Sequence, residues 1–295
     1  MRTLQINRIR IPFPETWNEL TKDQLLAVCK FYSQTLDYTL MRQLLFCSLS
    51  GLTILKRKEV EAEDEEKTGY WFEYKKATFR ISAIDLAYLL KFVDFLFDSY
   101  QRNNVITFYI HSQISEQRIP SVVVGGLKLY GTHSHLSNTP WIEWQTAMIH
   151  YKKYKTHGNV LDLDRLCATL YREKRTDIQE NDPRMFEDKR SIFSDYAVDD
   201  RALKIAKLPF DHKIAILFYF EGCIILLERL YPEVFRVPSP PVKSDNKPEQ
   251  QVNIGMALEN VVVSLSQNDP KLFDVYRQLN LHDMLRGLCE NIKKQ

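Results

Sequence analysis

The feature that most constrains the fold is a long apolar segment in the last third of the chain. Between residues 214 and 227 the only charged side chain is Glu221, so a helix over this segment is apolar on nearly every side. Such a helix has to be covered by other elements on several sides. Its apolar run falls short of the roughly 20 residues that span a bilayer. The segment predicts a buried central helix at about 211–230, with Asp211 capping its first turn and Pro232 ending it.

Composition indicates an ordinary globular chain with one large domain or two modest ones. The 295 residues include only nine glycines, which disfavours sheet-rich folds with many tight turns and favours helices. The 40 basic and 38 acidic side chains leave a formal net charge of +2. Proteins that bind nucleic acids usually carry a clear basic excess, so the charge does not indicate such a partner.

The cysteines indicate a reducing compartment. Each lies within an apolar helical pattern, and none belongs to a Cys-x-x-Cys pair. We expect buried free thiols at Cys29, Cys47, Cys167, Cys223 and Cys289. The first residues lack the apolar stretch of a signal peptide, so we expect a cytoplasmic protein.

Residues 1–130 are predicted to form a small α+β unit. Thr21 and Gln24 have the spacing of a capping box, which fixes the start of a helix near Lys22. Alternating apolar residues predict an opening strand or hairpin that Pro12 and Pro14 close. The other expected elements are helices at 37–49 and 82–100, a β-hairpin over 52–81 with a charged tip, and strands at 105–110, 119–124 and 127–130.

Residues 131–236 are predicted to form an all-α body around the central helix. Thr139 is expected to cap a helix with Pro140 in its first position, and this helix carries Trp141 and Trp144 on one face. The other expected elements are helices at 161–173 and 199–206, with a charged loop at 174–200 that runs over the surface.

The end of the chain is predicted to be a linker followed by an arm. The segment 237–252 is rich in proline and polar residues, a composition typical of flexible linkers. Helices at 253–267 and 270–293 then form a C-terminal helical arm over 253–295. The fold class predicted for the whole chain is α+β and mostly helical, with a buried central helix at about 211–230.

One segment combines cations with aromatic rings, a composition that can grip phosphates and stack bases. It runs from Ile149 to His157 and carries Lys152, Lys153 and Lys155. The alternative is an amphipathic helix whose lysines face water while its tyrosines pack on the core, and the balanced net charge favours it. A nucleic-acid-associated role, with further cations from Arg172 to Arg175, is therefore the second hypothesis.

Several histidines suggest a possible metal site. His133 and His135 lie two residues apart, and the sequence offers further histidines at His111, His150 and His157. No glutamate or cysteine completes a site at the spacing of His-Glu-x-x-His or Cys-x-x-Cys. We therefore expect no metal site.

No motif of catalytic chemistry is recognisable. Gly125, Gly126 and Gly131 lack the Gly-Lys-Ser/Thr ending of a phosphate loop. Neither Gly-x-Ser-x-Gly nor Ser-x-x-Lys occurs in a reactive context, and Cys223 in the apolar helix is expected to be inert. Paired carboxylates at helix starts are interpreted as caps and not as a metal site; they are Asp162 with Asp164 and Asp199 with Asp200. The sequence thus names no catalytic, metal or cofactor-binding residue, and we expect a protein that is not an enzyme.

Four stretches nevertheless share a recognisable pattern. They are PETWNELT from Pro14, WIEWQTA from Trp141, LCATLYR from Leu166, and a last block that joins LPF from Leu208 and FEGC from Phe220 to PEVF from Pro232. Together they resemble a family of proteins from the structural modules of tailed bacteriophages and prophages. The segment from Leu272 to Leu285 is similar to the short closing helices of such proteins. The family usually follows Leu-Tyr-Arg with proline, where this chain has Glu173.

The resemblance implies a cytoplasmic tail-assembly protein, comparable to the chaperones that hold a tape-measure protein before the tail tube polymerises around it. Its implied partners are phage structural proteins, with tape-measure and tail-tube proteins as candidates, and no membrane or cofactor is implied. The expected role is non-enzymatic protein–protein binding through exposed aromatic or apolar surface and the arm 253–295. The sequence leaves open whether the chain forms homo-oligomers or enters the virion.

Overall fold

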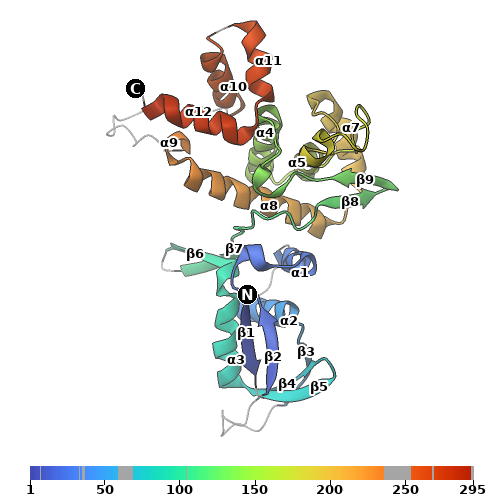
Figure 1. Ribbon diagram of the computed structural model, residues 1–295. Helices are drawn as coiled ribbons and strands as arrows, with labels where there is room; N and C mark the ends of the chain where they lie inside the picture. The colour runs from blue at the N-terminus through green and yellow to red at the C-terminus, as the bar shows by residue number, and fades with distance from the viewer. Residues whose placement is uncertain are drawn as a thin grey trace. The chain divides into compact units, whose positions relative to one another are not determined.

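The computed structural model describes residues 1–6, 8–32, 34, 37–58, 69–103, 105–235, 254–267 and 269–293. Within these residues the fold is α+β and mostly helical, as the sequence predicts. The chain divides into two compact units: Met1–Ile114 with Phe210–Ala215 form unit 1, and Ser115–Pro209 with Ile216–Gln295 form unit 2. In Figure 1 the strands and helices of unit 1 before α8 run from blue to teal, and those of unit 2 run from green to red.

Unit 1 combines helices with small antiparallel sheets. Its elements are β1 (Arg2–Ile6), β2 (Ile9–Phe13), a 3-10 helix (Trp17–Glu19), α1 (Lys22–Tyr32), α2 (Tyr38–Ser50), β3 (Thr53–Lys58), β4 (Gly69–Tyr74), β5 (Ala77–Ser82), α3 (Ala83–Leu89), a second 3-10 helix (Leu90–Leu96), β6 (Phe97–Arg102) and β7 (Val105–Ile110). Strand β1 pairs with β2, β4 lies between β3 and β5, and β6 pairs with β7. Helix α2 packs against α1, β2 and the second 3-10 helix.

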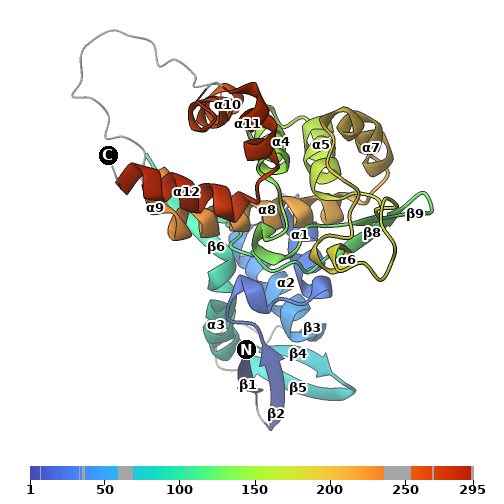
Figure 2. The same cartoon turned by 45° about the horizontal axis from the view of Figure 1, so that its top comes forward.

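Unit 2 is a helical body with one hairpin. Its elements are β8 (Ser121–Val124), β9 (Leu127–Tyr130), a 3-10 helix (Ser134–Leu136), α4 (Trp141–His157), α5 (Val160–Leu170), α6 (Arg184–Glu187), a 3-10 helix (Asp195–Ala197), α7 (Val198–Ile205), most of α8 (Phe210–Leu230), α9 (Pro232–Phe235), α10 (Ile254–Leu265), α11 (Pro270–Gln278) and α12 (Leu281–Lys293). Helix α4 contacts α5 on one side and the C-terminal helices on the other (Figure 2).

The units divide the chain differently from the predicted domains 1–130 and 131–236. Hairpin β8–β9 groups with unit 2, because Tyr130 and Arg172 exchange backbone hydrogen bonds of 2.7 and 3.0 Å. The first turn and a half of α8 groups with unit 1 instead. The predicted linker at 237–252 lies outside the described residues.

The C-terminal helices, predicted as an arm over 253–295, pack against α4 within unit 2. The backbone N–H of Leu281 donates to Thr139 O at 2.8 Å, and the N–H of Trp141 donates to Leu279 O at 2.8 Å. Leu281 at the start of α12 is fully buried. Residues far apart in the sequence therefore share one core here, and α11 and α12 belong to the body of the unit.

The central helix forms as predicted, and α8 covers Phe210–Leu230. Every residue from Lys213 to Phe220 is buried, which agrees with a helix that is apolar on nearly every side. The predicted cap does not form: α8 begins after Pro209 without a side-chain cap, and the Asp211 carboxylate accepts from the adjacent His212 N–H at 2.8 Å.

Two other helix starts test the caps that the sequence predicts. The capping box before α1 is confirmed, since the Gln24 N–H donates to Thr21 Oγ1 at 3.3 Å and the Thr21 N–H donates to Gln24 Oε1 at 3.0 Å. Helix α4 begins after Pro140 with no side-chain cap, so the predicted cap by Thr139 is wrong.

The helix predicted over 82–100 is wrong only in its last four residues, 97–100. Helical structure ends at Leu96, and the chain continues as β6, which pairs with β7 from Phe97 opposite Ile110 to Arg102 opposite Val105. The ladder with β7 supplies backbone hydrogen bonds that override the weak strand propensity of the β6 sequence. The hairpin predicted over 52–81 gains a third strand, because β5 also pairs with β4.

Two buried tyrosines hold the segment that leads into α4. Tyr219 on α8 donates its hydroxyl hydrogen to His133 O and accepts from the Leu136 N–H at 3.2 Å. The ring of Tyr171 lies against Gly131, where an added Cβ would come within 2.8 Å of the Tyr171 Cζ atom. Only a residue without a side chain fits this corner.

We expect Gly131→Ala to lower the free energy of unfolding by about 1–3 kcal/mol, because the new methyl group overpacks a buried ring. Gly287→Ala is the matched control: it lies inside α12 with nothing within 4 Å of the added Cβ. Alanine is favoured over glycine in helices, so this variant should gain about 0.5–1 kcal/mol. Urea unfolding measures both, and equal shifts in the two variants would contradict the packing at Gly131.

Candidate interaction surface

Hairpin β6–β7 of unit 1 exposes apolar side chains on both faces. Every residue from Asp98 to Arg102 and from Val105 to Tyr109 is exposed. Val105 is 62% exposed, Ile106 57% and Tyr100 53%. Grouped exposed apolar side chains on a soluble domain mark interaction sites more often than scattered ones do. The hairpin is therefore the first candidate for a binding surface.

One face of the hairpin carries two tyrosines. Cross-strand partners lie on the same face of an antiparallel pair, and Tyr100 opposes Thr107 while Asp98 opposes Tyr109. The ring centroids of Tyr100 and Tyr109 are 5.9 Å apart, and the Tyr109 hydroxyl donates to Asp98 Oδ2 at 3.3 Å. We call this the tyrosine face; its members are Asp98, Tyr100, Arg102, Val105, Thr107 and Tyr109. Aromatic side chains with a few charges are the composition typical of protein-binding surfaces.

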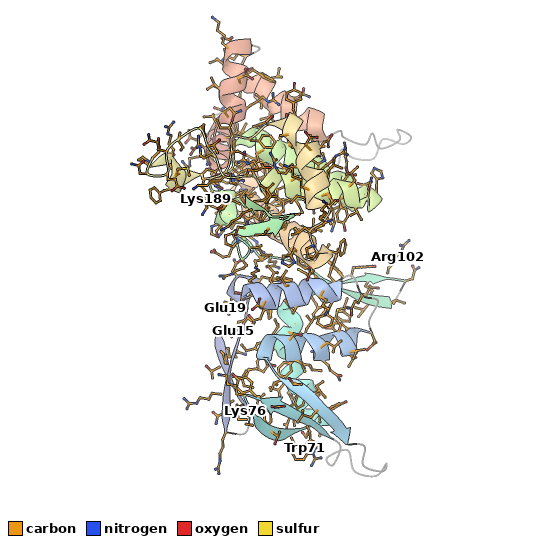
Figure 3. The ribbon with its side chains drawn as sticks, turned by 90° about the vertical axis from the view of Figure 1, so that its right-hand side faces the viewer. Glu15, Glu19, Trp71, Lys76, Arg102 and Lys189 are labelled. Carbon is orange, nitrogen blue, oxygen red and sulfur yellow. The ribbon has the colours of Figure 1, made fainter. Side chains whose placement is uncertain are left out.

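The opposite face anchors the base of the hairpin. Tyr38 at the start of α2 stacks on Phe108 with ring centroids 4.0 Å apart, and meets Phe97 edge-on at 5.2 Å. Asn103 in the turn has φ 50°, in the left-handed region that tight hairpins use. Figure 3 labels Arg102, which lies at the end of β6 next to this turn. The hairpin is thus held at one end and exposed toward its tip.

Unit 2 contains a buried ion-pair network that the sequence analysis did not find. Glu143 on α4 accepts from Arg172 Nη2 at 2.9 Å and from Arg190 Nη1 at 2.6 Å. Arg190 also forms a two-pronged contact with Asp188, from Nε to Oδ1 at 2.9 Å and from Nη2 to Oδ2 at 2.8 Å. Remaining donors of Arg190 reach the backbone oxygens of Leu170 and Asn138. Two carboxylates and two guanidinium groups balance each other.

The two arginines of this network have pKa values shifted in opposite directions. The Glu143 side chain is 0% exposed, and Arg190 is 1% exposed. Burial lowers the pKa of Arg172 to about 10, and the attraction of Glu143 only partly opposes this shift. Burial also acts to lower the pKa of Arg190, but Glu143 and Asp188 outweigh it and hold that pKa above its ordinary value.

The network fixes the long segment between α5 and α7. This segment was expected to run over the surface at 174–200, yet it anchors Arg190 in the core. Backbone bonds from Arg175 N–H to Lys189 O and from Ser191 N–H to Glu173 O close it into a loop at 2.9 and 2.8 Å. The sequence did contain one signal of this network. Glu143 places a charge beside Trp141 and Trp144, on a helix face that is otherwise apolar.

The basic and aromatic segment from Ile149 to His157 lies on α4. Its amphipathic interpretation is confirmed, since Lys152 and Lys153 are exposed while Tyr151 packs on Phe220 with centroids 5.7 Å apart. Lys155 pairs with Glu221 Oε1 at 2.9 Å. The lysines line the solvent side of a packed helix.

The second group of candidate cations is held in ion pairs. Arg172 lies in the buried network, Lys174 pairs with Glu180, and Arg175 Nη2 lies 2.6 Å from Asp177 Oδ2. Each of these cations already has a carboxylate partner, so a phosphate would have to compete for it.

The candidate histidines do not assemble into one site. His135 Nε2 lies 3.4 Å from Glu116 Oε1, and partial burial lowers the pKa of His133. His157 is exposed, and His111 belongs to unit 1. Among the described residues, no group of three or more histidine, cysteine or acidic side chains could hold a metal ion.

The candidate glycines have structural roles in a turn and in a tightly packed corner. Gly125 and Gly126 form the two-residue turn between β8 and β9 with φ of 56° and 80°, as a type I′ hairpin turn requires. Gly131 packs against Tyr171. Neither arrangement is a phosphate-binding loop, in which backbone amides precede the start of a helix.

One carboxylate of each pair, Asp162 and Asp199, contacts Arg165 and does not cap a helix. The cap of α5 is Asn159, which accepts from the Leu161 N–H at 3.0 Å. Asp162 lies 3.7 Å from Arg165 Nη1, and Asp199 lies 2.7 Å from Arg165 Nε. The predicted cap by these residues does not form. Asp164 is buried in α5, and Asp200 is exposed in the first turn of α7.

The cysteines are free, as predicted. Cys29, Cys167, Cys223 and Cys289 are buried, and Cys47 is half-buried. Burial raises the pKa of the Cys223 and Cys47 thiols to about 12. Both thiols are therefore protonated near neutral pH, and a protonated thiol is a poor nucleophile.

Comparisons with protein-family models, with curated proteins and with solved structures found no match. The resemblance to phage structural modules therefore stays a prediction. Across the described ranges, every helix falls short of the length and apolarity needed to cross a membrane.

We expect Glu143→Gln to lower the free energy of unfolding by about 3–5 kcal/mol, because it leaves two buried guanidinium groups with Asp188 as the one carboxylate of the network. Glu221→Gln is the matched control, since its partner Lys155 is 44% exposed. Partly exposed pairs contribute at most about 1 kcal/mol. Chemical unfolding of both variants tests this, and similar losses would show that the network does not carry the expected charge balance.

His150 should make stability depend on pH. Its Nδ1 lies 3.9 Å from Asp162 Oδ1, but burial, with help from Lys153 and Arg165, lowers the pKa of His150 to about 4. The folded state therefore holds a neutral ring, while the unfolded chain takes up a proton below about pH 6.5. This contribution to stability is present above pH 6.5 and is lost as the pH falls through 4.

His150→Gln should accordingly lose less stability than the wild type between pH 7 and pH 4, as measured by urea unfolding at several pH values. The same substitution at the exposed His157 is the control, and its curve should follow that of the wild type. Parallel curves for the wild type and His150→Gln would contradict the burial of a neutral imidazole.

Proposed function

We propose that this protein acts by binding other proteins, as a tail-assembly component of a tailed-phage or prophage structural module in the cytoplasm of the infected or lysogenic cell. Its partners would be phage structural proteins, with tape-measure and tail-tube proteins as candidates. The phage setting rests on the resemblance of the four sequence stretches. The binding role rests on the structure of unit 1.

The observation that carries the binding role is the exposed tyrosine face of hairpin β6–β7. Tyrosine provides a large amphipathic contact area with little conformational freedom to lose, which makes it common at the centre of interfaces. Tyr100 and Tyr109 lie side by side there, with Asp98 and Arg102 on the same face to orient a partner. These side chains therefore form the contact region that we propose for unit 1.

The structure gives less support to the nucleic-acid hypothesis. Lys155, Lys174 and Arg175 are each engaged by a carboxylate, and Arg172 is buried. A nucleic-acid surface needs cations that can neutralise phosphates along a groove.

The test is co-purification of the chain with the tape-measure and tail-tube proteins encoded by the same genome. We expect the wild type to capture one of them, and Tyr100→Ser with Tyr109→Ser to reduce capture by roughly tenfold or more, as loss of interface aromatics does. Tyr88→Ser is the matched control, because Tyr88 is a 63% exposed tyrosine on α3 of the same unit.

Circular dichroism should show that all three proteins are equally folded. Equal capture by the wild type and the double variant would place the binding surface elsewhere. Failure of the wild type to capture either candidate would overturn the tail-assembly proposal.

A further inference from the structure

In the part of the chain that the structure describes, one edge of strand β6 pairs with no other strand. Among the described residues, β6 and β7 form a two-stranded sheet. The His111 N–H donates to Leu96 O at 2.9 Å, and this pair continues the register in which Arg102 opposes Val105. Hydrogen-bonded pairs alternate along an antiparallel ladder. The even-numbered residues of β6 therefore bond to β7, and the backbone groups of Ser99 and Gln101 point to the open edge.

A second observation supports this assignment. The Ser99 N–H donates a hydrogen bond to the side chain of the preceding residue, Asp98, with Oδ1 at 2.7 Å. A carboxylate thus takes the place of a strand partner at the middle of the edge. This local contact is replaceable, because a new strand could offer a backbone carbonyl to the same N–H.

The charges on β6 are arranged so that the strand complements itself. Asp98 and Arg102 lie two positions before and two positions after Tyr100, on the same face. If two β6 strands pair antiparallel about Tyr100, Asp98 of each copy lies opposite Arg102 of the other. Opposite charges at facing positions stabilise a sheet, and like charges destabilise it. The charges therefore disfavour most other strands and favour a second β6.

We propose that β6 pairs with β6 of a second copy of this chain, in a two-fold symmetric antiparallel contact centred on Tyr100. Ser99 of each copy then exchanges backbone hydrogen bonds with Gln101 of the other, and Asp98 is released from Ser99 to meet Arg102 of the second copy. The two hairpins become a four-stranded sheet, and the tyrosine faces join into one row of aromatic rings. An isolated two-stranded hairpin is marginally stable in water, so the added strands also stabilise it.

This inference stands without the proposed function, because it concerns the purified chain alone. Sedimentation or light scattering over a range of concentrations should show a monomer–dimer equilibrium for the full chain. Arg102→Glu and Asp98→Arg each place like charges opposite one another, and each should weaken dimerisation roughly tenfold or more. The double variant Asp98→Arg with Arg102→Glu restores opposite charges and should dimerise like the wild type.

The single variants change the net charge in opposite directions, so a general charge effect cannot weaken both. Lys76→Glu, in the turn between β4 and β5 (Figure 3), is the control and should dimerise like the wild type. A wild type that stays monomeric at all concentrations would overturn the proposal. A dimer that the single variants leave intact, or that the double variant does not restore, would overturn it too.

A crosslink tests the register. At the symmetry centre, facing Cα atoms in a non-hydrogen-bonded pair are about 4.5 Å apart, which a disulfide can span. Tyr100→Cys should therefore form a disulfide-linked dimer under mild oxidation. Gln101→Cys should not, because its two copies are offset along the strands by about two residues, or roughly 7 Å. Equal crosslinking of both variants, or of neither, would contradict pairing about Tyr100.

Discussion

Glu143 is the residue on which the arrangement of unit 2 depends. Its carboxylate is fully buried, and an unpaired charge in that position would cost several kcal/mol. Arg172 follows α5 and Arg190 lies in the next loop, so the charge is compensated only when α4, the end of α5 and that loop come together. The network therefore selects one arrangement of segments that apolar packing alone would define less sharply.

The same contact changes what the sequence resemblance means. Glu143 belongs to the WIEWQTA stretch and Arg172 ends the LCATLYR stretch, and the two side chains meet in the core at 2.9 Å. Trp141 and Trp144 of the first stretch are buried beside them. These stretches therefore describe how unit 2 is built. They carry no information about which surface binds a partner, and that information has to come from residues outside them.

The parts of the fold that the sequence predicted depend on signals within a few residues. The capping box at Thr21 and Gln24 and the apolar run of α8 are of this kind. Strand β6 was missed because its sequence has weak strand propensity and forms only against β7. Arg190 was placed in a surface loop because its partner Glu143 lies 47 residues away. The structure of β6 and the burial of Arg190 both depend on pairing between distant residues, which a short segment of the sequence does not reveal.

The tyrosine face was missed for a different reason. Val105 to Ile110 was predicted as a strand, but alternation alone does not say that both faces of a strand stay exposed. Exposed edges and apolar faces invite unwanted association, and proteins usually guard them with charges, proline or bulges. Strand β6 has a regular register and carries one acidic and one basic side chain placed symmetrically about Tyr100. These two charges destabilise pairing with a strand that lacks complementary charges and stabilise pairing with a strand that has them. The charges that protect this edge from unwanted pairing therefore also specify its partner.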